Sequence, residues 1–185
     1  MKGRTVGLDI FNGELKMTET IFLEFDAITK NEDTFNWVYQ LIDEYIQEVK
    51  DRGGNVKIAS EKTYEFDSVT LMIQEDNAIN HFKEREGKKL ITLPLGDNGR
   101  QQTLSMSITL YPEAPEDFKL EPKELSCLFI DTQLGRDQKV ARYTTYAQIT
   151  HKPTGIIVTS TDERNQVTNK EMAERLLKAK LFKLK

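Results

Sequence analysis

Apolar side chains recur at helical spacing in the first half of the chain, between segments with strand patterns. They follow i, i+3, i+4 and i+7 positions from about Thr34 to Gly53-Gly54, which predicts an amphipathic helix that ends at the glycines. The flanking segments are rich in β-branched residues, as expected of strands. The elements predicted in this half, in the order β-α-β-β-α, are 18–25, the helix from 34, 56–59, 69–73 and a short helix over 76–85.

Strand patterns dominate the second half, which closes with a helix. Residues 94–102 read as a polar loop, and Lys152-Pro153-Thr154-Gly155 has proline and glycine where a type I turn favours them. The last helix is predicted to begin at a Thr168–Glu171 capping box, with Val167 and Met172 as a hydrophobic staple. Its predicted buried positions are Met172, Leu176, Ala179 and Leu181. The strands predicted in this half are 89–92, 103–111, 125–131, 146–151 and 156–160.

Three prolines mark a junction between two units. Pro112, Pro115 and Pro122 are close together, and proline disfavours both helix interiors and central strands. The predicted fold class is α+β, with two small α/β-sandwich-like units whose sheets are mixed or antiparallel. The predicted domains are an N-terminal extension over 1–17, a first unit over 18–115 and a second unit over 116–185 with a basic last helix.

The formal charge of −4 on the 185-residue chain is unevenly distributed. Residues 130–185 hold eleven basic and six acidic side chains, a net charge of +5, and the first 129 residues carry −9. A basic end on an acidic body is typical of a protein that meets a polyanion, and an ordinary solvated helix face explains it equally well. Since there is no apolar run of membrane-spanning length and no secretory leader pattern, a cytoplasmic location is expected.

Residue types that build common active sites are scarce. Cys127 is the only cysteine and is predicted to be inert in a buried strand, and His81 and His151 lie 70 positions apart, which gives no local metal motif. Asp43-Glu44 is expected on the solvent side of the long helix. No phosphate-binding glycine loop or hydrolase motif occurs. The residues alone therefore indicate an α+β protein with a basic end, no metal and no cofactor.

One segment of the second unit resembles a known family. It runs Gln148-Ile149-Thr150-His151-Lys152-Pro153-Thr154-Gly155-Ile156-Ile157-Val158 and is followed by Asp162-Glu163-Arg164-Asn165-Gln166. This is similar to the catalytic domain of bacterial class I peptide chain release factors, where an Arg-Ile-Thr-His-x-Pro-Thr-Gly-Ile run precedes an acidic-Arg-Ser-Gln segment and a basic helix. Counted back without gaps from His151, Gln138 falls on the glutamine of the family's Gly-Gly-Gln motif, and Arg136 and Asp137 fall on its glycines.

The resemblance extends into the first unit and covers roughly residues 18–185. It is nearest to the factor that reads UGA and UAA, whose codon-recognition region shares Gly99, Arg100, Thr103, Ser107, Tyr111 and Pro112. The family's Ser-Pro-Phe tripeptide is here Leu93-Pro94-Leu95, and Gln102 replaces the histidine before Thr103. The resemblance thus implies a codon-recognition-like site with altered base-contacting residues. Because the family's N-terminal helical domain and last segments have no counterpart here, a truncated paralogue is expected.

The resemblance implies a function on the ribosome. It implies binding to the A site through 16S and 23S rRNA, with peptidyl-tRNA as a further candidate partner and no DNA or membrane partner. Gln138 is the expected catalytic residue, at most for ribosome-dependent hydrolysis of the peptidyl-tRNA ester. We expect this activity to be weak or lost, because Arg136 and Asp137 replace glycines. The residues expected to bind rRNA are Lys139, Arg142, Arg164, Lys170, Arg175 and Lys178.

Two other functions are open at this point. One is a codon-independent rescue or occlusion factor that holds 23S rRNA through the basic unit. The other is a non-ribosomal adaptor that reuses the fold for another partner. Arg164 also has a purely structural interpretation, as an ion-pair partner of Asp162 or Glu163.

Overall fold

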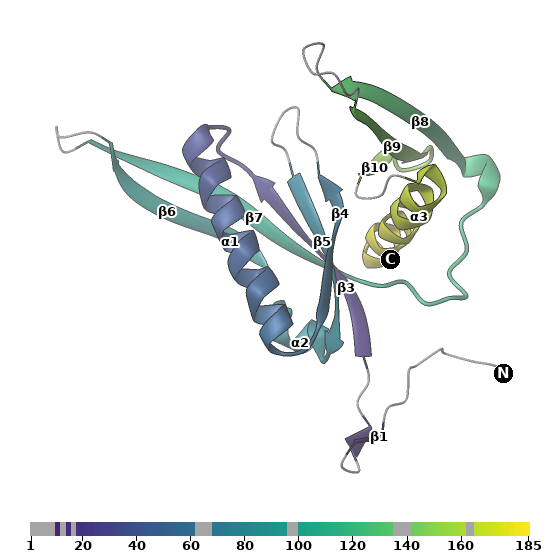
Figure 1. Cartoon of the computed structure of the whole chain (residues 1–185), viewed down its shortest axis with the longest axis horizontal. Helices are drawn as coiled ribbons and strands as arrows, with labels where there is room; N and C mark the ends of the chain where they lie inside the picture. The colour runs from purple at the N-terminus through teal and green to yellow at the C-terminus, as the bar shows by residue number, and fades with distance from the viewer. Residues whose placement is uncertain are drawn as a thin grey trace. The chain divides into compact units, whose positions relative to one another are not determined.

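The chain forms two compact units, each with helices and β-sheet (Figure 1). The computed structural model describes residues 10–11, 14–15, 18–61, 68–95, 100–134, 142–161 and 165–185. Unit 1 consists of residues 1–57 and 62–111, and unit 2 of residues 112–185 with 58–61. The α+β class predicted from the sequence is confirmed. None of the helices in these described ranges is long and apolar enough to cross a lipid bilayer.

Unit 1 is built on a five-stranded sheet with the strand order β4-β5-β3-β7-β6. Its strands are β3 (Thr18–Ala27), β4 (Asn55–Glu61), β5 (Ser68–Asp76), β6 (Gly87–Leu95) and β7 (Arg100–Pro112). β3 pairs antiparallel with β5, and β6 with β7. A short antiparallel pair, β1 (Ile10–Phe11) and β2 (Glu14–Leu15), precedes β3.

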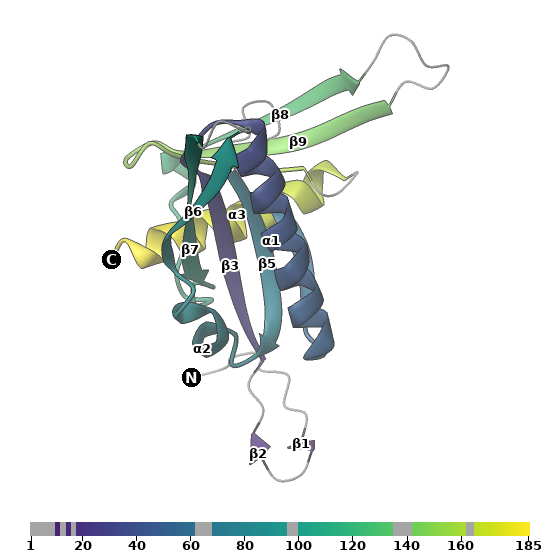
Figure 2. The ribbon, with the colours of Figure 1, turned by 90° about the vertical axis from the view of Figure 1, so that its left-hand side faces the viewer.

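Two helices, α1 (Glu32–Asp51) and α2 (Ala78–Lys83), pack against this sheet, and Figure 2 shows α1 lying along it. The ring of Tyr45 on α1 lies edge-on to Phe25 of β3, with 5.5 Å between centroids, and 5.7 Å from Phe82 of α2. Phe25 and Phe82 are fully buried. The two helices therefore share one hydrophobic core against β3.

The predicted long helix is confirmed and begins two residues before Thr34. Asn31 caps it by accepting a hydrogen bond from the Thr34 N–H at 2.9 Å. The side chains buried on its inner face are Thr34, Val38, Ile42, Tyr45 and Val49. Asp43 and Glu44 are exposed, as predicted. The helix ends at Asp51, and Gly53 adopts the left-handed conformation with φ of +79°.

Gly54 lies where α1 meets the sheet too closely for a side chain. A Cβ atom at this position would stand 2.7 Å from Cγ1 of Val49 and 2.8 Å from Cβ of Glu75. Neither atom is the end of a flexible side chain, so the backbone must shift. We expect Gly54→Ala to lower the free energy of unfolding by about 1–3 kcal/mol, the usual cost of overpacking. Urea unfolding measures the change, and Asn55→Ala at the exposed neighbouring position should be near neutral.

Charged side chains tie the end of α1 to α2 and β5. Arg85 and Arg52 both donate hydrogen bonds to the Glu48 carboxylate, and Arg52 also binds Glu75 at 2.9 and 3.0 Å. These bonds, first those from Arg85, hold the pKa of Glu48 below its ordinary value of 4.5, although burial opposes them. His81 Nδ1 lies 2.9 Å from Glu75 Oε1. The network fixes the helix ends without a buried unpaired charge.

The lowered pKa of Glu48 predicts how acid affects stability. Its stabilisation is fully present above the ordinary carboxyl pKa and is lost as pH falls through the lowered folded-state pKa. We expect Glu48→Gln to be less stable than wild type at pH 7, by a margin that shrinks as pH falls below the ordinary carboxyl pKa, as measured by urea unfolding. The effect should be modest because the Glu48 side chain is 35% exposed. Glu44→Gln on the exposed face is the control, and a pH-independent difference would contradict the assignment.

Unit 2 is a three-stranded antiparallel sheet with one long helix. The strand order is β10-β9-β8, and the bounds are β8 (Leu125–Leu134), β9 (Arg142–His151), β10 (Ile156–Ser160) and α3 (Gln166–Lys183). A 3-10 turn, η1 (Pro122–Glu124), precedes β8. α3 packs on β9 and β10, burying Leu176 against a face that includes Ala147, Ile149 and Val158. The four predicted apolar positions of α3 are all buried.

The segment after Pro112 is held on α3 by side-chain contacts within unit 2. Glu113 Oε1 accepts hydrogen bonds from Nε and Nη2 of Arg175, at 2.8 and 2.5 Å. Phe118 lies edge-on to Phe182, with 5.8 Å between ring centroids, and Lys185 Nζ lies 4.5 Å from the Phe118 ring centroid. The proline-marked junction is therefore an ordered strap along the helix.

The predicted polar loop over 94–102 is wrong at both ends. Pro94 pairs with Gln101 and Leu95 with Arg100, so β6 and β7 extend well into the predicted loop. Proline is tolerated here because β6 is the edge strand of its sheet and needs no N–H on its outer side. β9 likewise begins at Arg142, four residues earlier than predicted.

Three further predictions for unit 2 are also wrong. α3 begins at Gln166, where Asn165 caps it by accepting from the Val167 N–H at 2.9 Å, so Thr168 lies inside the helix. Val167 is 61% exposed and forms no staple with Met172. Cys127 lies in a strand, as predicted, but is exposed. Its strand is at the sheet edge, where α3 does not cover it.

Candidate functional site

The β8–β9 pair presents the candidate catalytic motif at its end. The two strands pair over ten residues, from Leu125 opposite His151 to Leu134 opposite Arg142. Figure 2 shows both strands extending beyond α3. The motif residues Arg136, Asp137 and Gln138 belong to the connection between the strands, as does Lys139, and all four lie outside the described residues.

The candidate rRNA-binding residues divide between β9 and α3. Arg142 is the first residue of β9, and Arg164 lies outside the described residues. On α3, Lys170 Nζ stands 3.6 Å from Glu174 Oε1, whereas Arg175 donates two hydrogen bonds to Glu113. Lys178 lines a pocket beside the helix. Arg175 is thus committed to an acidic partner within the chain, whereas Lys170 is exposed.

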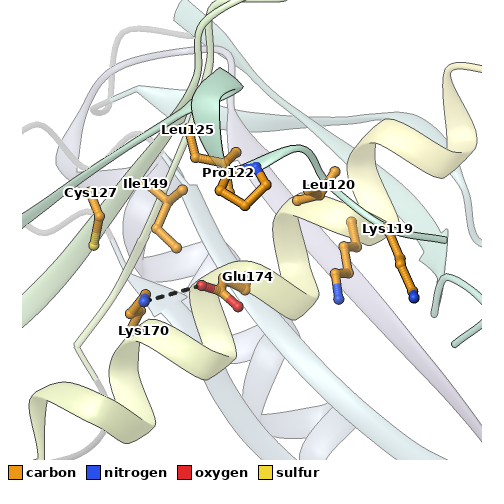
Figure 3. Close-up of a pocket in the computed structure, with 9 residues that line it drawn as sticks. Lys119, Leu120, Pro122, Leu125, Cys127, Ile149, Lys170 and Glu174 are labelled. Carbon is orange, nitrogen blue, oxygen red and sulfur yellow. Dashed lines mark ion pairs between the residues drawn. The ribbon is translucent and has the colours of Figure 1, made fainter. Parts of the chain in front are cut away.

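A pocket that sequence reasoning missed lies between α3 and the strap that leads into β8. Its volume is about 440 Å³. Figure 3 shows Leu125, Cys127 and Ile149 on the strand side, Leu120 and Pro122 along the strap, and Lys170 and Glu174 on α3. Lys119 and Lys178 complete the lining. The pocket has an apolar floor and three lysines against one glutamate. No spacing signal predicts it, because the lining comes from four separate segments.

The codon-recognition-like residues face one another across β6 and β7. Leu93 pairs with Gln102, and Thr103 Oγ1 lies 3.4 Å from Thr92 Oγ1. Pro94 is exposed, and Leu95 is the last residue of β6. The tripeptide and the Gln102-Thr103 pair therefore belong to one hairpin.

Gln102 is tied to the first turn of α1. Its Nε2 donates a hydrogen bond to Asp33 Oδ2 at 2.5 Å. This contact, which sequence reasoning missed, places a carboxylate beside the hairpin and engages the amide that replaces the family's histidine. Asp33 and Gln102 are 69 residues apart, so no local pattern signals the pair.

Tyr111, one of the residues shared with the codon-recognition region, has a structural contact. Its hydroxyl donates to Glu24 Oε2 at 2.8 Å. Burial, followed by the nearby Glu24 charge, raises the pKa of Tyr111. The phenol is therefore a fixed hydrogen-bond donor that links β7 to β3.

The described residues contain no group of three or more His, Cys, Asp or Glu side chains placed to hold a metal ion. The charged clusters of these residues are instead the ion pairs of α1, α2 and α3 given above.

Comparison with known proteins places these elements in one class. Residues 114–185 match the RF-1 domain family model. The chain is 29% identical over 170 residues to peptide chain release factor 1 of Nautilia profundicola, covering 89% of this chain and 48% of that protein. It is 28% identical over 190 residues to peptide chain release factor 2 of Thermosipho melanesiensis, covering 99% and 52%.

A third relative and a solved structure agree with this class. Peptide chain release factor 2 of Staphylococcus haemolyticus is 33% identical over 123 residues, covering 64% of this chain and 33% of that protein. The fold matches the structure of RF2 of Thermus thermophilus with a TM-score of 0.78, at 24% identity, over 90% of this chain and 50% of that one. The chain spans about half the length of the relatives it matches most fully.

The first unit has the β6–β7 hairpin, and the second has a sheet and helix with a long β8–β9 pair. Together these elements have the fold of a release factor. Residues 114–185 form an RF-1 domain, and over most of its length the chain is similar to class I peptide chain release factors.

Proposed function

We propose that this chain binds the A site of the ribosome and hydrolyses peptidyl-tRNA weakly or not at all. The observation that carries the proposal is the placement of Arg136-Asp137-Gln138 between β8 and β9 of an RF-1 domain, where the family has Gly-Gly-Gln. The RF-1 domain supports an approach to the peptidyl-transferase centre. The two replaced glycines support an impaired reaction.

The altered motif weakens the reaction through the backbone. The resemblance implies that the glutamine N–H donates a hydrogen bond to the oxyanion that develops during ester hydrolysis. Losing one such donor costs about 10²–10³ in rate. Glycine pairs serve where a chain adopts positive φ or passes close to another surface. We expect the side chains of Arg136 and Asp137 to disfavour a positive φ and to hinder a close approach. Asp137 also adds a negative charge, which RNA would repel. We therefore expect the Gln138 N–H to stabilise the oxyanion poorly.

The β6–β7 hairpin supports weak codon discrimination. Leu93 offers no side-chain hydrogen bond, and the Gln102 amide is engaged by Asp33. We expect ribosome affinity to differ by less than about tenfold, or ~1.4 kcal/mol, among UGA, UAA and sense codons. Binding to ribosomes programmed with each codon measures this. Leu93→Ser with Leu95→Phe, which restores the family's tripeptide, should raise the preference for stop codons. A larger preference in the unaltered chain would show that the hairpin still decodes.

Co-sedimentation with ribosomes tests the proposal itself. Binding to ribosomes together with little peptide release is the expected result. If the chain does not co-sediment at low salt, the ribosomal function is wrong and an adaptor function takes its place. Substantial peptide release that is equal on stop and sense codons would instead identify a rescue factor.

A further inference from the structure

β8 is an edge strand with unusual composition. In the order β10-β9-β8 it pairs with β9 alone among the described strands, so its other edge presents backbone N–H and C=O groups. Residues 125–130 read Leu-Ser-Cys-Leu-Phe-Ile and contain no charge and no proline. Leu128 and Phe129 are 52% and 47% exposed. Long apolar edges of this kind pair readily with another strand.

The other edge strands of the three- and five-stranded sheets carry the usual protection. β6 has Lys88, Lys89 and Pro94, and β4 has Lys57 and Glu61. β10, the opposite edge of the same sheet, has only five residues. Charges, prolines and short length all discourage strand addition. β8 has ten residues and none of these features over its first six.

The pocket lies on the helix-facing side of this edge. Residues directly opposite in an antiparallel pair share a face, so Cys127 and Phe129 lie on the side of Ile149 and Ala147, which α3 covers. Cys127 and Phe129 are nevertheless exposed, because α3 packs on β9 and β10. An added strand would direct every second side chain toward Cys127 and the pocket floor.

The mainly basic rim of the pocket favours a negatively charged added strand. Lys119, Lys170 and Lys178 line it, and Glu174 is the one acidic lining residue (Figure 3). A carboxylate on the pocket side of an added strand would meet these ammonium groups. A second copy of this chain fits less well, because symmetric β8–β8 pairing brings equivalent surfaces together and sets the same lysines against one another. RNA satisfies the lysines but makes no use of the strand edge.

We propose that β8 accepts an extended peptide of a partner protein as an added strand, with apolar and acidic residues alternating along its pocket-facing side. Main-chain hydrogen bonds to the β8 edge supply affinity. An apolar side chain beside Cys127 and a carboxylate at the lysine rim supply specificity. This surface is distinct from the β8–β9 connection that carries Gln138, so the proposal does not depend on hydrolysis.

The probe is a capped, fluorescent nonapeptide with Thr at odd positions and Val, Glu, Val and Glu at even ones. Fluorescence anisotropy with the full chain measures binding. We expect the peptide to bind, and a version with Lys in place of Glu to bind at least about tenfold more weakly. A version N-methylated on the amides that face β8 should lose binding, because it cannot donate to the edge. Equal binding of the N-methylated peptide would overturn strand addition.

Variants of the chain locate the site. Lys170→Glu with Lys178→Glu should weaken peptide binding about tenfold, since reversal turns two attractions into repulsions. Lys50→Glu with Lys83→Glu is the matched control on exposed positions of unit 1 and should leave binding unchanged. Leu128→Lys adds a charge to the edge on the face opposite the pocket, and it should also abolish binding. Circular dichroism verifies that each variant is folded. Failure of the pocket and edge variants to alter binding would overturn the proposal.

Cys127 is a built-in reporter, because it is the only cysteine and it lines the pocket. Its modification by a chromogenic disulfide reagent should slow when the peptide is bound. Two results would assign this surface to a different partner. Concentration-dependent dimerisation of the free chain that Leu128→Lys prevents would show that a second copy pairs with β8. A single-stranded RNA that binds as tightly as the peptide and displaces it would show a general polyanion surface.

Discussion

Replacing Arg136 and Asp137 with glycine should raise ribosome-dependent peptide release by about 10²-fold, the order of one recovered oxyanion donor. The glycines remove two Cβ atoms, each costing about 1–2 kcal/mol where the backbone must be left-handed, and they remove the negative charge of Asp137, which would repel RNA. The Gln138 N–H could then approach the ester. Release of labelled peptide from stalled ribosomes is the measurement.

Two further variants separate the motif from its surroundings. Gln138→Pro in the double-glycine background removes the N–H and should abolish the gain. Glu116→Gly with Asp117→Gly introduces the same number of glycines at exposed turn positions and should give no gain. If the double-glycine motif variant binds ribosomes as well as the parent and releases no more peptide, features outside the motif limit the reaction. The chain would then act by occluding the A site.

The sequence predicts best where periodicity and local caps coincide. The long run of apolar residues from Phe35 to Val49 predicts α1 because one helix face faces the sheet over its whole length. A turn over Lys152–Gly155 is also predicted correctly in its place, although the Gly155 N–H donates to the His151 carbonyl at 2.8 Å and not to the Lys152 carbonyl that a type I turn would use. Both depend on residues close together in the chain.

The errors come from contacts between distant segments. A run such as Leu125–Ile130 has the same local pattern in a central strand as at an edge, so strand order alone decides that Cys127 is exposed. The error at the start of α3 is local instead, because the sequence predicts a cap at Thr168 whereas Asn165 caps the helix and Asn169 is buried inside it. The pocket beside α3 and the Gln102–Asp33 contact join segments that no spacing rule connects.

Ribosome affinity should fall about 10²–10³-fold between 50 and 200 mM salt if four to six cations of unit 2 neutralise rRNA phosphates. The range of four to six cations follows from the six candidate rRNA-binding residues. Two of these already have partners within the chain, because Arg175 is bound to Glu113 and Lys170 is near Glu174. Those two must give up an internal partner to reach RNA, so they contribute less than residues without such competition. Equilibrium binding over a salt series gives the slope of log affinity against log salt.

Single charge reversals then test individual contacts. Arg142→Glu and Arg164→Glu should each weaken binding and make the salt slope shallower by about one unit, because each removes a phosphate contact. Lys50→Glu makes the same charge change on an exposed position of α1 and should leave the slope unchanged. If Arg164 only pairs with Asp162 or Glu163, Arg164→Glu will lower the stability of the chain and leave the salt slope of ribosome binding unchanged. A salt-insensitive affinity would refute phosphate binding by unit 2, because counterion release accompanies every such contact.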